Sequence, residues 1–239
     1  LVTARRTRSA KEVSTAWQID AYQMDIPVMT HPTDAIVSPS SAIAFNNLGG
    51  LAVLNGEGLW ARHADPEAAI AELREIALED LTGVRAVTRL QELHKAPINE
   101  EFLVAAVQKI REEGGTVAVR VSPQRARELT PGLIKAGIDM LVVQGTIISA
   151  EHVSGEDAPL NLKEFIGSLD VPVIAGGVVD YKTALHLMRT GAAGVIVGYG
   201  GAEGVTTTGP VLGVEVHMAT AIADAAAARR DYLDETGGR

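Results

Sequence analysis

The chain has 239 residues, of which 46% are hydrophobic and 21% charged, and its formal net charge is −9. This length and composition predict a single globular domain with a sizeable core. An acidic balance without a Lys/Arg cluster argues against nucleic-acid binding, and the lack of an apolar run of about 18 residues argues against a membrane span. Cysteine is absent, which excludes disulfides and a cysteine nucleophile. No signal peptide is visible, so we expect a cytoplasmic protein.

Six short, apolar, β-branched runs predict β-strands. They read as continuous apolar segments, which is typical of a parallel sheet covered on both faces. The predicted strands are 26–30, 50–54, 116–122, 140–143, 171–175 and 195–198.

Helical patterns separate these runs. Asp65 and Asn99 are expected N-caps, and Pro66 suits the first position of a helix. The stretch 61–113 is helical in pattern and is predicted to be an insertion within the same domain. The last helix should end at Gly237 and bury one side. That side is predicted to comprise Met218, Ile222, Ala225, Ala226 and Leu233.

Strand–helix alternation predicts an α/β fold, either a (β/α)₈ TIM barrel or an open doubly wound sheet. Each predicted strand runs into a Gly- or Thr-rich turn, and barrels keep their functional residues at such strand ends. This favours a TIM barrel with six of its eight strands present. Because the chain starts with Leu1 and stops at Arg239 directly after a helix, we expect it to be incomplete at both ends.

A Gly/Thr-rich loop follows the sixth predicted strand, from Gly198 to Gly213. A dinucleotide fingerprint would need glycine where Glu203 stands, and it would belong after the first strand of a βαβ unit. The loop is therefore either an ordinary flexible barrel loop or a ligand-binding loop.

Several segments together resemble the IMP dehydrogenase/GMP reductase family. They are Ile26-Pro-Val-Met-Thr-His-Pro-Thr-Asp34, Leu48-Gly-Gly-Leu-Ala-Val-Leu54, Val171-Pro-Val-Ile-Ala-Gly-Gly-Val-Val179 and the loop leading to Met218-Ala-Thr220. The chain is similar above all to the actinobacterial IMP-dehydrogenase-related paralogues that lack CBS domains. The stretch 61–113 is too short and too helical for a CBS pair.

The resemblance implies a purine nucleoside monophosphate as substrate, NAD or NADP as cofactor, and a homo-oligomer, a tetramer by analogy. It places substrate contacts at His31, Thr33, Asp34, Gly200, Gly201 and Gly204. It places cofactor contacts at Gln144, Gly145, Gly176 and Gly177. The six histidines share no ligand spacing, so no metal is expected.

The chain departs from the family at the reactive positions. Thr206 stands where the family has its catalytic cysteine, and Thr208 matches a threonine two residues later. A threonine hydroxyl is a poor nucleophile without a strong base beside it. Leu141 to Gly145 stand where the family has Asp-Ser-Ser-Gln-Gly, Gly177 replaces an asparagine and Ile196 replaces an arginine.

Three functions therefore stay open. The first is a purine-nucleotide oxidoreductase, with Thr206 and Thr208 at the catalytic positions. The second is a catalytically silent paralogue that binds a purine nucleotide and acts in regulation or assembly. The third is a different phosphate-binding barrel enzyme that has kept only the scaffold.

Overall fold

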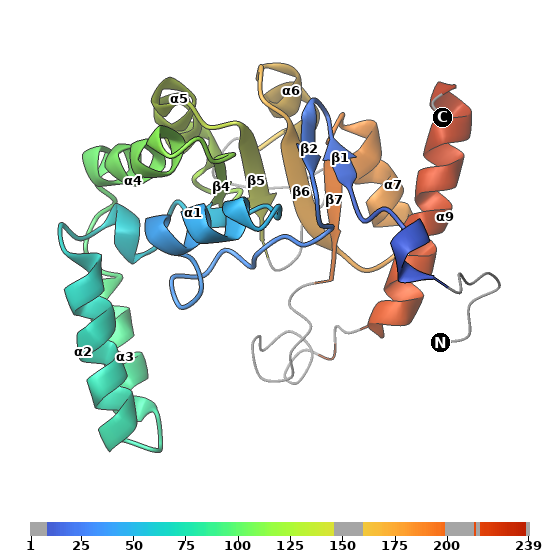
Figure 1. The fold of residues 1–239 in the computed structure, drawn as a ribbon. Coiled ribbons are helices and arrows are strands. Elements are labelled where there is room, and N and C mark those ends of the chain that lie inside the picture. Colours follow the sequence, from blue (N-terminus) through green and yellow to red (C-terminus); the bar gives the residue numbers. More distant parts are fainter. Residues whose placement is uncertain (1–8, 146–159, 199–212, 214–215, 238–239) are drawn as a thin grey trace.

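The computed structural model in Figure 1 describes residues 9–145, 160–198, 213 and 216–237. Its centre is one parallel sheet whose five strands follow one another in chain order. They are β3 (Val53–Asn55), β4 (Ala118–Val121), β5 (Met140–Gln144), β6 (Val173–Val178) and β7 (Gly194–Val197). A doubly wound sheet reverses its strand order at a switch point, whereas this order never reverses. The barrel-type alternative is therefore the one that the sheet supports.

The predicted first strand, 26–30, is wrong as a strand, because the structure has only a single parallel bridge between Met29 and Leu51 there. Leu51 N donates to Val28 O at 3.0 Å, and Thr30 N donates to Leu51 O at 3.0 Å. The next donor, Val53 N, bonds to the Thr30 hydroxyl at 2.9 Å instead of to backbone. Pro27 brings no N–H to the ladder. The segment therefore lies beside β3 without forming a regular strand.

Helices connect the strands in the alternation that the sequence predicted. They are α1 (Pro39–Asn47), α2 (Pro66–Glu79), α3 (Val84–Leu93), α4 (Glu100–Glu112), α5 (Ala126–Ala136), α6 (Leu162–Gly167), α7 (Tyr181–Arg189) and α9 (Met218–Thr236). The predicted N-caps are confirmed: the Asp65 side chain accepts from Ala68 N, and the Asn99 side chain accepts from Glu101 N, both at 2.9 Å. Two 3₁₀ turns, η1 (Ala10–Glu12) and η2 (Leu59–Ala61), complete the set of helical elements among the described residues.

The sheet separates two apolar cores, as its continuous apolar strands predicted. The outer core packs the sheet against α4, α5 and α7 and includes Leu54, Val119, Leu141, Leu103 and Leu187. The inner core lies on the opposite face and contains Met24, Leu51, Val53, Ala118, Met140, Val142 and Ile174. Successive strand residues therefore alternate between an inner and an outer environment.

An antiparallel hairpin, β1 (Trp17–Ile19) and β2 (Tyr22–Met24), was not predicted from the sequence. Its apolar side chains pack onto the inner core, and the Tyr22 hydroxyl lies 3.3 Å from Asp139 Oδ1, just before β5. The hairpin thus covers the amino-terminal end of the inner face. The opposite end, where the strands finish, is the end at which α2 and α3 project from the body as a pair (Figure 1).

The predicted buried side of the last helix is only partly right. Ala225 is buried as predicted, but Met218 and Ile222 are 38% and 54% exposed, and Ala226 is exposed. The buried side of α9 is Ala221, Ala225 and Ala228, because small side chains let α9 pack closely against α7. The predicted end at Gly237 is confirmed by its left-handed backbone, φ 67°.

Candidate functional site

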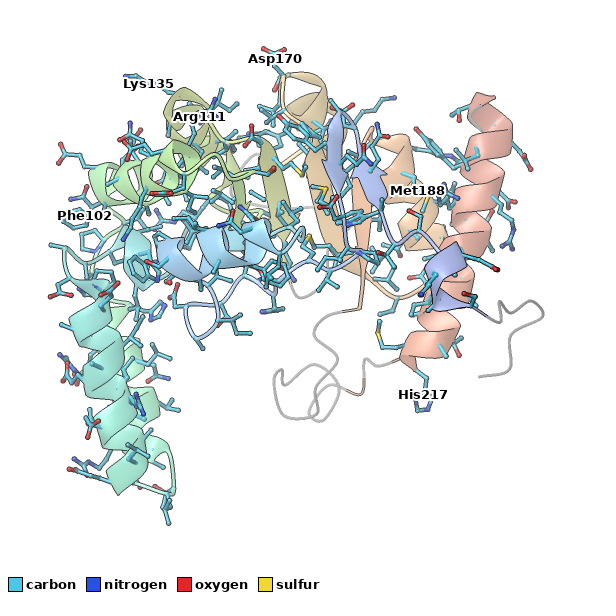
Figure 2. All side chains as sticks on the ribbon, in the orientation of Figure 1. Phe102, Arg111, Lys135, Asp170, Met188 and His217 are labelled. Carbon is cyan, nitrogen blue, oxygen red and sulfur yellow. The ribbon has the colours of Figure 1, made fainter. Side chains whose placement is uncertain are left out.

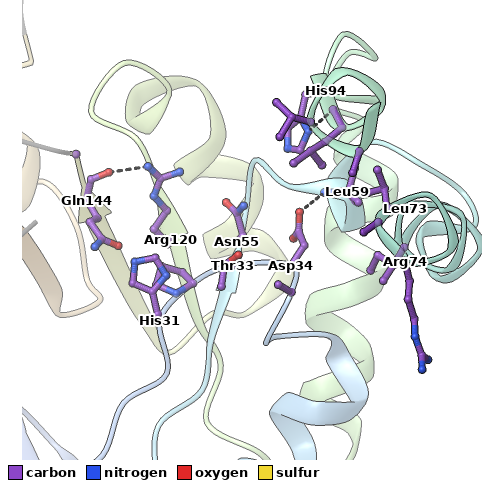
Figure 3. Close-up of a pocket in the computed structure, with 18 residues that line it drawn as sticks. His31, Thr33, Asp34, Asn55, Leu59, Leu73, Arg74, His94, Arg120 and Gln144 are labelled. Atoms are coloured by element: carbon purple, nitrogen blue, oxygen red, sulfur yellow. Dashed lines mark hydrogen bonds between the residues drawn. The ribbon is translucent and has the colours of Figure 1, made fainter. Parts of the chain in front are cut away.

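A cavity of about 760 Å³ lies where β3, β4 and β5 end, and the α2–α3 pair forms its far wall (Figure 3). This volume is in the range of small-molecule sites. Its polar side is formed by His31, Thr33, Asp34, Asn55, Arg120, Gln144 and Gly145. Its apolar side is formed by Leu59, Ile70, Leu73, Ala77, Ala86, Val87 and Leu90. Five of the predicted ligand contacts therefore meet in one cavity.

Asp34 is a half-buried carboxylate of this cavity that bonds to the backbone. Its Oδ2 accepts a hydrogen bond from Leu59 N at 2.8 Å, which fixes the start of η2 (Figure 3). The carboxylate lies over Gly58, where a Cβ atom would stand 2.2 Å from Oδ1. Oδ1 itself is buried and has no hydrogen-bond partner among the described residues. Asp34 therefore positions the cavity wall through Leu59 and leaves one buried acceptor unused.

Burial raises the pKa of the Asp34 carboxyl, and the hydrogen bond from Leu59 N opposes this in part. The folded protein then binds a proton more tightly at Asp34 than the unfolded chain does, whose pKa is about 3.9. The contribution of Asp34 to stability is consequently most favourable below that value. It declines as the pH rises through the raised pKa of the folded state.

Asp34→Asn removes this titration and keeps an oxygen for Leu59 N. We expect the unfolding free energy of the variant to improve relative to wild type as the pH rises from about 4 to 7. Urea unfolding of the full-length protein at both pH values measures the difference. A wild type that gains stability over Asp34→Asn across this interval contradicts the assignment.

Arg120 is a site residue that the sequence analysis missed. It sits in β4 and donates from Nη2 to Gln144 O at 2.8 Å (Figure 3). Its Nη1 lies 3.7 Å from Glu57 Oε1. Burial lowers the pKa of its guanidinium, and the Glu57 carboxylate opposes that shift. Glu57 also accepts a short hydrogen bond from Ser122 N. These contacts tie together the ends of β3, β4 and β5.

The predicted cofactor positions lie at the ends of β5 and β6. Gly145 N donates to Gly176 O at 3.0 Å, and Gly177 N donates to Gly145 O at 3.2 Å. Gln144 and Gly145 line the cavity, whereas Gly176 and Gly177 are buried and are not among its lining residues. At Gly176 a Cβ atom would stand 2.5 Å from Ile196 O, so this position requires glycine for packing.

The residues matched with the family's Asp-Ser-Ser, Leu141 to Val143, lie within β5 and not after it. Leu141 and Val143 lie inside β5, fully buried in the outer core, and Val142 faces the inner core. The strand ends at Gln144, which lines the cavity. Gln144 is therefore the side chain that this strand presents at its carboxyl end.

Five predicted residues, Gly200, Gly201, Gly204, Thr206 and Thr208, lie outside the described residues. His217, beside that loop, is exposed at the amino end of α9 and points away from the sheet (Figure 2). Within the described part of the chain, no group of three His, Asp or Glu side chains is placed to hold a metal ion. No helix of that part is long and apolar enough to cross a membrane.

A nucleotide cofactor fits the residues of this cavity. Arg120 offers a cation with donors that no described residue uses, Thr33 and Asn55 offer polar side chains, and the α2–α3 wall offers an apolar surface. Phosphate, polar and ring groups of a nucleotide each match one of these features.

Comparison with known proteins finds relatives that belong to one family. The family model of the IMP dehydrogenase / GMP reductase domain matches residues 1–235. An uncharacterized oxidoreductase of Mycobacterium tuberculosis is 67% identical over all 239 residues, which cover 64% of that protein. The inosine-5′-monophosphate dehydrogenase of Haemophilus influenzae is 37% identical over 105 residues, 44% of this chain and 20% of that protein.

The solved structure of an IMP dehydrogenase/GMP reductase-like protein from Corynebacterium glutamicum superimposes with a TM-score of 0.91 and 59% sequence identity. The match covers 100% of this chain and 62% of that one. The predicted barrel-type α/β fold is thereby confirmed. The chain spans less than two thirds of the length of these full-coverage relatives.

Proposed function

The chain belongs to the IMP dehydrogenase/GMP reductase family, and on that premise we propose that it forms most of the barrel of a purine-nucleotide oxidoreductase. The observation that carries the proposal is the cavity at the strand ends, where His31, Thr33, Gln144 and Gly145 meet. In α/β barrels the carboxyl ends of the strands carry the reacting groups. We also propose a single barrel domain without CBS domains, acting in the cytoplasm as a homo-oligomer.

The proposed ligands are a purine nucleoside monophosphate and NAD or NADP. A bound nicotinamide would supply the site that accepts or donates hydride. The chain's own residues bind and orient: Gln144 and Gly145 at the end of β5, and His31 and Thr33 opposite them. Asp34 does not contact the ligand in this proposal, and it positions the cavity wall through its hydrogen bond with Leu59 N. The glycines Gly200, Gly201 and Gly204 are proposed as backbone contacts to the substrate, and Gly176 and Gly177 as the floor beneath the cofactor.

Thr206 takes the cysteine position in this proposal, and Thr208 follows it. A hydroxyl with an ordinary acidity cannot replace a thiolate as attacking group. We therefore assign both threonines to hydrogen bonding with the base or sugar, so that catalysis proceeds without a cysteine adduct.

Spectrophotometric assays of the full-length protein test this function. We expect absorbance change at the nicotinamide band with IMP plus NAD or with GMP plus NADPH. Thr206→Ala should lower kcat/KM by roughly tenfold, the effect of one lost hydrogen bond, and not abolish turnover. Thr236→Ala, at the exposed end of α9, is the matched control and should behave as wild type.

A specific observation supports the second candidate, a silent nucleotide-binding paralogue. Ile196, which stands where the family has arginine, packs against the inner core beside Ile174. Gly177 brings no side chain at the position of the asparagine. Nucleotide binding without turnover in both assays would favour this candidate, and turnover at an ordinary enzymatic rate would exclude it. The absence of both binding and turnover would contradict both functions.

A further inference from the structure

Arg120 is the only charged residue within the five described strands of the parallel sheet. Alternation along β4 puts Val119 and Val121 in the outer core and Ala118 in the inner core. Arg120 therefore points to the inner face, one layer nearer the carboxyl end than Ala118. Removing a guanidinium from water is costly unless the charge gains a partner. The position calls for an anionic or carbonyl partner at the strand ends.

Among the described residues, protein groups use only part of the hydrogen-bonding capacity of Arg120. A guanidinium carries five N–H donors in a rigid fork. Within the described residues, one hydrogen bond is formed, from Nη2 to Gln144 O at 2.8 Å. The Glu57 carboxylate, at 3.7 Å from Nη1, is near enough to orient the guanidinium but too far to form a hydrogen bond. Donors of Arg120 are thus left for a ligand in the cavity that it lines.

The surroundings of Arg120 define the ligand. Figure 3 shows Arg120 between Gln144 and Asn55, with His31 beside it, on the polar side of the cavity. Asp34, the acidic residue that lines the cavity, accepts a hydrogen bond from Leu59 N. The opposite wall is mainly apolar and includes Leu73 and Leu90 of α2 and α3, with Arg74 and His94 as its polar residues. A molecule with an oxyanion at one end and a flat, weakly polar ring system at the other matches this arrangement.

We propose that Arg120 binds a phosphate oxygen of the nucleotide held in this cavity, with Glu57 and the Gln144 carbonyl fixing its guanidinium. The arginine fork matches phosphate geometry, which makes it better suited to this contact than a lysine point charge. The inference rests on the proposed function and names Arg120 as the residue that binds the phosphate of its nucleotide. The phosphate belongs either to the mononucleotide or to the dinucleotide cofactor.

Calorimetric titration of the full-length protein separates these sources. IMP, GMP, NAD and NADP are titrated singly into wild type, Arg120→Gln and Arg120→Lys. We expect Arg120→Gln to weaken binding of the ligand whose phosphate it holds by about 10- to 100-fold, the range for a lost hydrogen bond to a charged group. Arg120→Lys should recover part of that loss. Loss for IMP and GMP identifies the mononucleotide, and loss for NAD and NADP identifies the dinucleotide.

Two control variants distinguish the loss of a ligand contact from a loss of folding. Arg125→Gln removes an exposed arginine at the N-cap of α5 that pairs with Glu128 in the first turn, and the variant should bind all ligands as wild type does. The double variant Glu57→Gln/Arg120→Gln removes both charges, so that no carboxylate is left unpaired, and it should show the same loss as Arg120→Gln. Melting temperatures verify that each variant is folded.

The proposal is overturned if folded Arg120→Gln binds all four nucleotides as tightly as wild type. A measurement on the wild-type protein alone can also overturn the proposal. If inosine binds as tightly as IMP, and nicotinamide riboside binds as tightly as NAD, the phosphate groups make no favourable contact. Wild type that binds none of the nucleotides contradicts the proposed function itself. Unchanged binding by Arg120→Gln, with wild type binding normally, contradicts only the role of Arg120.

Discussion

Leu141→Asp is expected to prevent the full-length protein from folding. Leu141 is fully buried in the middle of β5, surrounded by the outer core. Its loss removes apolar packing worth about 2–5 kcal/mol, and an unpaired carboxyl in the same place adds several kcal/mol more. Since a whole domain is typically stable by about 5–15 kcal/mol, this single change consumes most of that margin. Soluble yield and circular dichroism melting measure the effect.

Gln144→Asp is the matched control, three residues along the same strand. Gln144 is half-buried at the carboxyl end of β5, and the guanidinium of Arg120 already lies against its carbonyl. Arg120 bonds the main-chain oxygen, which the substitution keeps, and the new carboxylate lies at the cavity instead of in a core, so we expect a folded protein that melts close to wild type. A folded Leu141→Asp and an unfolded Gln144→Asp would mean that β5 ends earlier than the structure has it.

Gly176→Ala is expected to destabilise the protein by about 3 kcal/mol, at the upper end of the usual cost of overpacking. The new Cβ atom would stand 2.5 Å from both the Cβ and the O atom of Ile196 on β7. Backbone cannot rotate away as a flexible side chain can, so β6 and β7 must separate locally. Equilibrium unfolding in urea gives the loss directly.

Gly167→Ala tests whether this cost comes from packing. Gly167 is the last residue of α6, and a Cβ atom there meets nothing within 4 Å. Alanine in place of glycine should leave stability unchanged or raise it by a few tenths of a kcal/mol. Equal losses at Gly176 and Gly167 would contradict the close contact between β6 and β7.

The sheet was predictable because its physical cause is visible in the sequence. A strand buried on both faces is mostly apolar, and β4, β5 and β6 show this pattern. The helices before them were readable from their caps, Asp65 and Asn99. The segment 26–30 has the same composition. It nevertheless forms only one bridge, because the Thr30 side chain takes the hydrogen bond that a backbone carbonyl would accept. Composition does not reveal that a side-chain hydroxyl replaces a backbone carbonyl as the acceptor at this position.

The β1–β2 hairpin and the face of α9 were harder to predict. The hairpin strands have three residues each, and the turn between them uses a left-handed Asp20, φ 51°, a tolerated but weak signal. In α9 the largest apolar side chains, Met218 and Ile222, are exposed, while alanines make the contact. Close approach of two helices favours small residues, so ranking positions by size gave the wrong side.

The residues of the candidate site at the strand ends were predictable, but its arginine was not. His31, Thr33, Asp34, Gln144 and Gly145 were predicted from the resemblance to the family, and they meet in one cavity because turns after barrel strands gather at one end. Arg120 was missed, although a single arginine within Ala118-Val119-Arg120-Val121 was a readable signal. Its pairing with Glu57 depends on the register of β3 with β4, which only the folded chain fixes.

The central claim is that the cavity at the ends of β3, β4 and β5 holds a purine or nicotinamide nucleotide. A crystal structure of the full-length protein, soaked with IMP or GMP together with NAD or NADP, tests this most directly. We predict nucleotide density against Gln144 and Gly145, with a phosphate at Arg120. Nucleotide bound elsewhere, such as in the cavity between α5 and α6 beside Pro131 and Phe165, would contradict the account.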